Sequence, residues 1–368
     1  MKLPSFQVPA VLRRDGVQRA IKAALALGTM GYLVYLVEPS EIAASVAEAH
    51  HGYLAAAAVL LPANLLLEAA VWRRILTVVV PRASWRNAFG ALLCGFALGL
   101  FTPARSGDFA GRALYFERGD RWAIAATVLV QRFLDMWAAV SAGTGALVWA
   151  LRTGRLGESG VGGEVWMGLC VAGAGTSLAL ALLLLWPRRS TRWVRRLIPS
   201  ERVRRHLDFL GRLGTGRMTS AALGAAARFG VYATQFVLLA RAFSPDAPVG
   251  LLYGGVGLIF FAKHLIPSLT LMDVGIREGA AVFFLSTQLG LPQATAFNAA
   301  FFLFLLNLVA PAALGAPLLL QLRFEQEEPP DHEEPPDHEE SNGREDDPPA
   351  RASPPAAEEE RPTRRAIE

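Results

Sequence analysis

The sequence predicts an all-α polytopic membrane protein with about six spanning helices and two re-entrant helical hairpins in an inverted repeat. The chain of 368 residues is 52% hydrophobic, and its charges gather in short bursts between long uncharged runs. Soluble domains of this size do not usually segregate their charges so completely. Several runs reach the roughly 20 apolar residues that a helix needs to cross the hydrocarbon core of a bilayer.

The first span is predicted at residues 21–37, IKAALALGTMGYLVYLV, in a basic N-terminal stretch with Arg13, Arg14, Arg19 and Lys22. This run is longer than the apolar part of a signal peptide, and equally apolar segments follow it, so we expect a retained anchor. Cytoplasmic loops retain Lys and Arg. The N-terminus is therefore predicted to be cytoplasmic.

The second span is predicted at residues 52–72, after an outer loop (38–51) that carries three glutamates and no basic residue. It ends at a basic loop, which is predicted to lie inside and contains Arg73, Arg74, Arg82 and Arg86. Glu68, near the end of this span, is interpreted either as a proton site or as an interfacial carboxylate, and we favour the second reading.

The first hairpin is predicted where a short apolar run (87–101) meets FTPARSGDFAGR, residues 101–112. A full crossing would leave four arginines outside, against the positive-inside bias: Arg105, Arg112, Arg118 and Arg121. A chain that breaks at Pro103 and Gly107 and returns near Gly119 avoids this conflict. Non-helical backbone at membrane depth is tolerated only when it is buried in protein or lines a wet cavity, so a cavity is implied.

Four more spans are predicted at residues 122–150, 165–186, 219–243 and 294–322, with a Gly-rich outer loop at 151–164. Topology then requires a second hairpin within residues 250–290 that enters from outside. Residues 187–217 hold ten arginines and apolar residues at helical spacing. This segment is predicted to be either an amphipathic helix on the anionic inner leaflet or an orientation-setting loop without specific lipid recognition.

Two domains are expected: a membrane domain at residues 1–323 and a cytoplasmic tail at residues 324–368. The tail contains EEPPDHEEPPDHEE, and its low hydrophobicity with many Pro and Glu residues predicts disorder. Its two histidines, His332 and His338, give at most a weak metal site. Cys94 and Cys170 fall in apolar runs, where packing is the expected role.

The two predicted hairpins share a pattern in which an aspartate follows a proline by five or six residues and an arginine comes four residues later. The two sets are Pro103, Asp108 and Arg112, and Pro267, Asp273 and Arg277. Oppositely inserted related halves that meet at mid-membrane are typical of inverted-repeat transporters, which build the substrate site from broken helices. Asp and Arg four residues apart on a helix face the same way and can pair.

Further ionisable residues lie at membrane depth, where they indicate a functional site by default. Arg105 has no evident partner in the sequence, and Arg132 lies three residues before Asp135 in an apolar span. Arginine suits phosphate, and the start of a broken helix favours an anion. These features predict a wet cleft for an anionic headgroup. Alternatively, the charges only neutralise one another, or the arginines of the first hairpin are cytoplasmic anchors.

Three residues near the second hairpin have open roles. Lys263 and His264 flank its break and would form either a gate or, as we favour, a satisfied polar pair. Glu278 follows Arg277 directly and is expected to point elsewhere on the helix.

Four motifs together resemble the lysylphosphatidylglycerol synthase transmembrane region, over residues 10–322. They are TPARSGDFAGRAL, VQRFLDM, GIREGAAVF and LVAPAALG. This family is the flippase-like membrane half of the multiple peptide resistance factor, and it also occurs alone. The resemblance implies a multi-pass inner-membrane protein that moves membrane lipids between leaflets: an anionic or aminoacylated phospholipid, or a lipid-linked intermediate. The charge pattern predicts that both termini are cytoplasmic.

The resemblance also implies which residues line the route: Arg105, Asp108, Arg112, Arg132, Asp135, Arg277 and Glu278. With Asp273 from the hairpin pattern, these are the expected substrate-binding residues. Asp108 stands where a glutamate is common in the family, and Phe304 stands where the last span often has an arginine. The second half of the cavity is therefore expected to be less cationic than in relatives.

The leading prediction is a lipid flippase-like transporter that is not an enzyme and needs no cofactor, metal or nucleic acid. The alternatives are a membrane-embedded enzyme that modifies lipid headgroups and a non-transporting scaffold that recruits partners. The sequence shows no metal-ligand cluster, nucleophile elbow or phosphate loop, and the tail is too short for a synthase domain. A homo-oligomer is compatible with the sequence.

Overall fold

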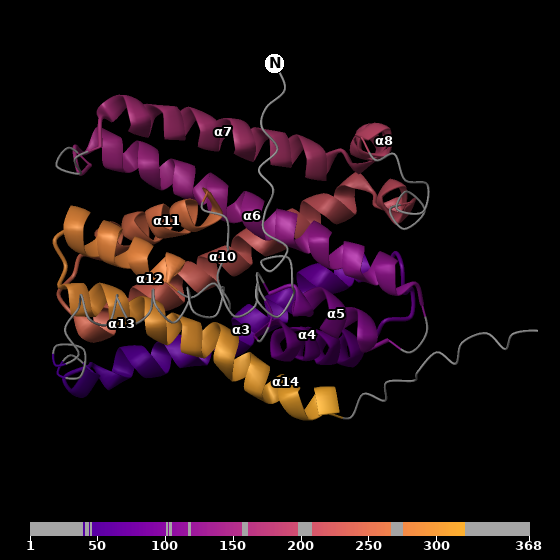
Figure 1. Cartoon of the computed structure of the whole chain (residues 1–368), viewed down its shortest axis with the longest axis horizontal. Helices are drawn as coiled ribbons and strands as arrows, with labels where there is room; N and C mark the ends of the chain where they lie inside the picture. Colours follow the sequence, from indigo (N-terminus) through magenta and orange to yellow (C-terminus); the bar gives the residue numbers. More distant parts are fainter. Residues whose placement is uncertain are drawn as a thin grey trace, which may run out of the picture. The chain divides into compact units, whose positions relative to one another are not determined.

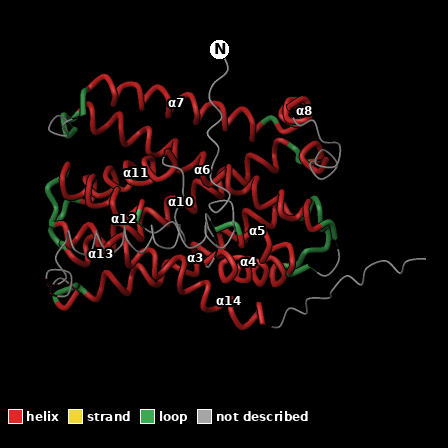
Figure 2. Tube along the Cα trace, in the orientation of Figure 1, coloured by secondary structure: helices red, strands yellow, loops and turns green. Residues whose placement is uncertain are grey.

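Helices make up almost all of the described part of this computed structural model, and that part contains no strand (Figure 2). The structure describes residues 40, 44, 46–100, 102, 105–116, 119–156, 161–197, 208–265 and 275–320. By its internal contacts the chain divides into two units, Met1–Arg323 and Phe324–Glu368. The predicted first span and the predicted disordered tail lie outside the described residues, so both remain predictions.

Five helical segments of the described part are long and apolar enough to cross a membrane. They are α3 (His51–Leu76), α6 (Arg121–Arg152), α7 (Gly163–Leu185), α10 (Thr215–Phe243), and a continuous run made of α13 (Gln293–Phe304), a π-helical turn η4 (Leu305–Val309) and α14 (Ala310–Leu320). The predicted all-α polytopic class is confirmed.

Shorter helices connect the long ones along the chain (Figure 1). They are α4 (Trp85–Leu100), α5 (Gly107–Leu114), α8 (Pro187–Leu197), a 3-10 turn η2 (Asp208–Arg212), α11 (Val249–Leu265), α12 (Ile276–Ala281) and a π-helical turn η3 (Val282–Gln288). Their lengths fit hairpins and surface segments better than complete crossings, since a crossing takes about 20 residues.

The long helices start and stop where local chemistry favours it. Asp120 caps α6, because its carboxylate accepts the N–H groups of Trp122 at 3.0 Å and Ala123 at 3.1 Å. Such caps satisfy backbone donors that have no partner within the helix. Gly154, with a φ of +69°, lies just after the end of α6, in a backbone region that glycine tolerates without a steric penalty.

Helices α3 and α10 run antiparallel. Where α3 ends and α10 begins, Arg217 donates from Nη1 to the Arg74 carbonyl at 3.1 Å. At the other end, the His50 N–H donates to the Ala242 carbonyl at 2.7 Å, and the Thr295 hydroxyl, at the start of α13, donates to the Phe243 carbonyl at 3.4 Å. These contacts show which helix ends lie together at each of the two ends of the bundle.

Exposed arginines gather at the end where α3 stops and α6 and α10 start, here called the arginine-rich end. An apolar cluster joins α3, α6, α7, η2 and α10 there. The exposed arginines of the described residues at this end are Arg74, Arg82, Arg86, Arg121, Arg189, Arg192, Arg196, Arg212 and Arg217. The helix order thus returns basic loops to one end, as the charge pattern predicts.

The two segments predicted to be hairpins connect to opposite ends of the bundle. α4 and α5 follow α3 and precede α6, so this first hairpin starts and finishes at the arginine-rich end (Figure 1). α11, α12 and η3 connect the end of α10 to the start of α13, which places both ends of the second hairpin at the opposite end. Residues 266–274, where the second break is predicted, and Pro103 lie outside the described residues.

Glycines allow α4 and α5 to pack closely. A methyl group at Gly95 would overlap the Asp108 carboxylate, and one at Gly111 would overlap the Cys94 backbone. Small residues are what let helix backbones approach in membranes. At the turn between these helices Arg105 has a φ of +53°, a left-handed conformation that is strained for a residue with a side chain.

Candidate functional site

A cavity of about 410 Å³ lies among α3, the two hairpins, α6, α10 and η4. Its lining on α6 (residues 131–139) and on α10 (residues 228–232) falls near the middle of each helix. Leu303, Asn307 and Leu308 place it near the middle of the last long run as well. The cavity is therefore at mid-depth in the bundle, as the two-hairpin hypothesis expects.

Arg112 is the hub of the first half of this site. Its Nε donates to Asp108 Oδ1 at 2.7 Å, Nη1 to Gln131 Oε1 at 2.8 Å, and Nη2 to both Glu68 Oε1 at 3.0 Å and Asp108 Oδ2 at 3.1 Å. The side chain is only 2% exposed, and its guanidinium lies 5.0 Å from the Trp72 ring centroid. The predicted pairing of Asp108 with Arg112 is confirmed.

Arg132 is held more loosely than Arg112. Its Nη2 donates to Asp108 Oδ2 at 2.6 Å, while 33% of its side chain remains exposed. Its guanidinium also lies 5.6 Å from the Phe109 ring centroid. Asp108, 1% exposed, thus joins a buried arginine of its own helix to a half-exposed arginine of α6.

The sequence-based reading of Glu68 as an interfacial carboxylate is wrong. Glu68 is 4% exposed, and its two oxygens accept from Arg112 and, at 2.8 Å, from Arg228 Nη2. The carboxylate points inward because the turn of α3 that carries it packs against the first hairpin and α10, which spacing within one span does not reveal.

Arg228 was not singled out by the sequence reasoning. Besides Glu68 it contacts Asp135, with 3.0 Å between Nη1 and Oδ1. Asp135 therefore pairs across to α10, whereas Arg132 pairs with Asp108. The sequence does contain a feature that could have identified it, because Arg228 is a lone arginine in the middle of a long apolar run. Ionisable residues in such runs are costly and indicate a functional site.

Arg277 and Glu278 form the corresponding pair of the second hairpin. Arg277 Nη2 donates to Glu278 Oε1, and the other Glu278 oxygen accepts the Gly275 N–H at 2.8 Å. The expectation that Glu278 points elsewhere is wrong, because as the third residue of α12 it folds back to cap the helix start, where Arg277 reaches it. The predicted partner Asp273 lies outside the described residues.

Phe304 occupies the place where the resemblance implies an arginine in many relatives. The Arg277 guanidinium lies 5.6 Å from the Phe304 ring centroid, in cation–π geometry. On the first hairpin, the Arg105 guanidinium lies 4.9 Å from the Phe96 centroid. Each hairpin thus places an arginine over a phenylalanine next to the cavity.

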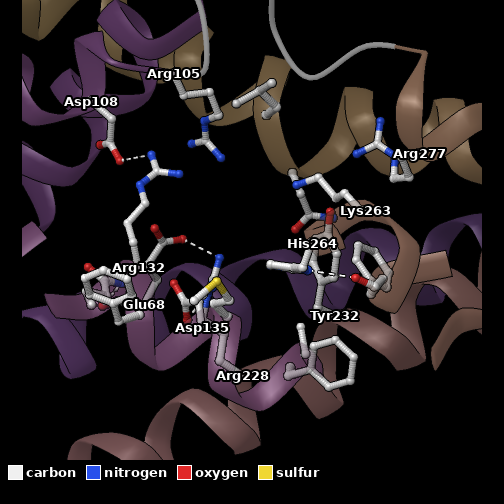
Figure 3. A pocket seen from close by; sticks show the side chains of 18 of the residues that line it. Glu68, Arg105, Asp108, Arg132, Asp135, Arg228, Tyr232, Lys263, His264 and Arg277 are labelled. Carbon is white, nitrogen blue, oxygen red and sulfur yellow. Dashed lines mark hydrogen bonds and ion pairs between the residues drawn. The ribbon is translucent and has the colours of Figure 1, made fainter. Parts of the chain in front are cut away.

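Lys263 and His264 also line the cavity. His264 Nδ1 lies 2.7 Å from the Phe260 carbonyl oxygen, one turn earlier on α11. Figure 3 shows Arg105, Asp108, Arg132 and Glu68 on one side of the open space, and Lys263, His264, Tyr232 and Arg277 on the other. Both hairpins therefore contribute cationic side chains to one space.

Positive charge exceeds negative charge in the described lining. The cationic residues are Arg105, Arg112, Arg132, Arg228, Lys263 and Arg277, and the carboxylates are Glu68, Asp108 and Asp135. Six positive and three negative charges leave a formal excess of +3, or +2 when Glu278 beside Arg277 is included. The apolar part of the lining includes Phe133, Met136, Phe229 and Leu303.

No group of three His, Cys, Asp or Glu side chains in the described segments is arranged to hold a metal ion. Cys94 and Cys170 are free and buried, in keeping with the packing role expected of them.

The fold and the cavity define a class: a polytopic α-helical membrane protein with a charged cavity at mid-depth. Residues 19–315 match the family model described as lysylphosphatidylglycerol synthase TM region. The chain belongs to this family, which links it to lipid handling in membranes and confirms the resemblance noted in the sequence. Comparisons with curated proteins and with solved structures found no match.

Proposed function

We propose that this protein is a flippase-like transporter that moves an anionic lipid headgroup between leaflets through the mid-depth cavity. The observation that carries the proposal is the number of cationic side chains, four from the two hairpins and two from α6 and α10, that the described residues bring to that cavity. Charge at membrane depth is costly and marks a functional site, and a phosphate group would interact favourably with these cations while its acyl chains stay in lipid. Guanidinium groups bind phosphate bidentately and keep their charge.

The arrangement of the hairpins supports transport. We propose that both are re-entrant and belong to an inverted repeat, because they start from opposite ends and carry the same Pro, Asp and Arg pattern. One half of the repeat would contain α3 to α6 and the other α10 to α14. A hairpin helix of each half packs against a helix of the other half: α4 against α14, and α11 against α6. Sites between such repeats open alternately to the two sides as one repeat moves against the other.

The lining residues divide into two roles under this proposal. Arg112 and Arg228 are held by carboxylates and position the site. Arg132 and Lys263, on opposite sides of the space in Figure 3 and only half-buried, would contact the headgroup phosphate. Arg105 would join them from the turn of the first hairpin. The carboxylates limit the excess charge, so that a bound anion can leave again.

The test uses the purified full chain in vesicles that contain a fluorescent phosphatidylglycerol, with membrane-impermeant reductant reporting arrival in the outer leaflet. We expect the double variant Arg132→Gln with Lys263→Gln to slow translocation by about tenfold or more, since a hydrogen bond to a charged group contributes about 1.5–3 kcal/mol. The matched control is Arg121→Gln, which changes an exposed arginine in the first turn of the same helix as Arg132. A folded double variant that matches wild type would reject the site.

The same preparation separates the alternative functions. Mass spectrometry of the vesicle lipids after incubation detects a headgroup-modifying enzyme, because its product differs in mass. Deletion of residues 325–368 separates a transporter from a scaffold. A transporter without its tail still translocates lipid in vesicles. A scaffold translocates no lipid with or without the tail, and the deletion abolishes its function in cells.

We also propose that the arginine-rich end faces the cytoplasm in an inner membrane, following the positive-inside bias. Arg86→Cys places a thiol at that end and Glu164→Cys at the opposite one, both at exposed positions. An impermeant maleimide added to intact spheroplasts should label only the second. Labelling of the first alone would reverse the orientation.

A further inference from the structure

A second cavity, of about 200 Å³, lies close to the arginine-rich end and is separate from the charged site. Its walls come from α6, the end of α7, α8, η2 and α10: Ala126, Leu129, Val130, Phe133, Leu183, Leu184, Pro187, Ser190, Thr191, Leu210, Leu213 and Met218. We call it the apolar pocket. The transport proposal makes no use of it.

The inner surface of the apolar pocket offers hydrocarbon only. Its two hydroxyl groups are already bonded, since Ser190 Oγ donates to the Leu183 carbonyl at 2.5 Å and Thr191 Oγ1 to the Pro187 carbonyl at 2.7 Å. A cavity of this size with apolar walls does not hold water. An apolar chain is therefore the kind of ligand that fits.

The pocket has an outer rim as well as a closed floor. Leu129 is 43% exposed and Leu183 is 38% exposed, whereas Leu213 and Met218 on the floor are each 1% exposed. Leu129 belongs to α6 and Leu183 to α7, two helices long enough to span. A chain in the surrounding bilayer can therefore enter sideways between them.

Exposed arginines flank two of the residues that line the pocket. Ser190 and Thr191 line the pocket, and the residues that flank them on α8, Arg189 and Arg192, are exposed. The sequence of α8, PRRSTRWVRRL, contains five arginines and no acidic residue. Exposed arginines on the helix that supplies part of the wall of an acyl-sized pocket suit the anionic phosphate of a phospholipid.

The position of the pocket suits a lipid of the leaflet at the arginine-rich end. On α6 it uses residues 126–133 and the charged cavity uses residues 131–139, so the pocket lies nearer the helix start. A lipid with its phosphate at α8 would direct its chain from the membrane surface toward the bundle centre. Phe133 lines both cavities and separates the chain from the charged site.

We propose that the apolar pocket binds one acyl chain of an anionic phospholipid whose phosphate is held by Arg189 and Arg192. This lipid is a bound partner that fixes α8 against α6, α7 and α10, distinct from the cargo in the charged cavity. Under this proposal the basic segment, residues 187–217, recognises an anionic lipid specifically and does more than set the orientation of the protein. It does not rest on the transport function.

The experiment uses the full chain in nanodiscs of phosphatidylcholine that contain a small fraction of photoactivatable phosphatidylglycerol or, in parallel, photoactivatable phosphatidylcholine. Each probe carries its diazirine on an acyl chain. After illumination, peptide mass spectrometry locates the adducts. We expect adducts on the pocket residues of α6 and α7, with more from phosphatidylglycerol than from phosphatidylcholine.

Two variants test the two parts of the site. Arg189→Gln with Arg192→Gln should lower the preference for phosphatidylglycerol by about 25-fold, since each arginine near an anionic surface contributes about 5-fold. Ala126→Phe should fill the pocket and remove the adducts of both probes. The control Arg82→Gln with Arg86→Gln makes the same charge change at the same end and should preserve the preference.

The outcomes are distinct. Equal labelling by the two wild-type probes, or an unchanged preference in the Arg189 and Arg192 variant, overturns the phosphate site. Adducts absent from the pocket of the wild type, as when another segment of the chain or detergent fills it, overturn the acyl site. Since translocation is not measured, failure here leaves the transport proposal standing, and the reverse holds as well.

Discussion

Arg112 is expected to stabilise the fold rather than to contact the cargo. The change Arg112→Met keeps most of the side-chain length but removes four hydrogen bonds: two to Asp108, one to Gln131 and one to Glu68. Interhelical hydrogen bonds in membranes contribute about 0.6 kcal/mol each on average, so the bonds to Gln131 and Glu68 alone give about 1 kcal/mol. The Asp108 and Glu68 carboxylates, which lose this partner, increase the loss in the free energy of unfolding further.

Removing one partner from a buried ion pair costs about 3–5 kcal/mol. The lower part of this range applies here, because Asp108 keeps Arg132 and Glu68 keeps Arg228. We therefore expect Arg112→Met to lower the free energy of unfolding by about 3 kcal/mol. The assay is reversible unfolding in mixed micelles titrated with sodium dodecyl sulfate, followed by circular dichroism.

A double-mutant cycle identifies the source of the loss. Glu68→Gln removes the charge on the partner carboxylate, and the combination with Arg112→Met should cost at least about 1 kcal/mol less than the two single losses together, since directly bonded residues are coupled. Arg121→Met is the control for an exposed arginine. A loss below about 1 kcal/mol for Arg112→Met, or additive losses in the cycle, would refute the assignment of Arg112 as a structural hub.

Three further predictions concern the frame of the site, measured by the same unfolding titration. Gly95→Ala introduces a methyl group on α4 that overlaps the Asp108 carboxylate of α5 and should cost about 1–3 kcal/mol, whereas a methyl group at Gly145 has no neighbour within 4 Å and Gly145→Ala should be neutral or slightly stabilising; equal effects would contradict the close-packing argument. Asp120→Ala removes the cap of α6 and should cost about 1 kcal/mol, and no loss would show that the cap is dispensable. Asn64→Leu leaves the Asn307 Oδ1, its partner at 2.6 Å, without that donor and should cost about 1–3 kcal/mol; a gain in stability would count against the bond.

The positions of the long helices followed from hydropathy alone. The span predicted at residues 52–72 is α3 (His51–Leu76), and the span predicted at 165–186 is α7 (Gly163–Leu185). This works because each spanning segment must satisfy its own backbone hydrogen bonds in lipid, so its apolar length is encoded locally. The Asp108–Arg112 pair was predictable for the same reason, since four residues make one helical turn.

Contacts between helices were not predictable in this way. Glu68, Arg112 and Arg228 are separated by 44 and 116 residues in the sequence and meet only because α3, the first hairpin and α10 pack at a particular rotation and register. Hydropathy carries little information about rotation here, because these helices are apolar on most of their surface. A search for every charged residue inside an apolar span would have found Arg228, but not its partners.

The sequence by itself determined the membrane class, the boundaries of most spans, the basic loops at one end and the pairing of Asp108 with Arg112, because these depend on composition and on spacing within one helix. Only the tertiary structure decided that Glu68 joins two arginines, that Glu278 turns back to Arg277, and that α6, α7, α8 and α10 enclose an apolar pocket beside exposed arginines. These features arise between segments that are distant in the chain, and packing alone brings them together.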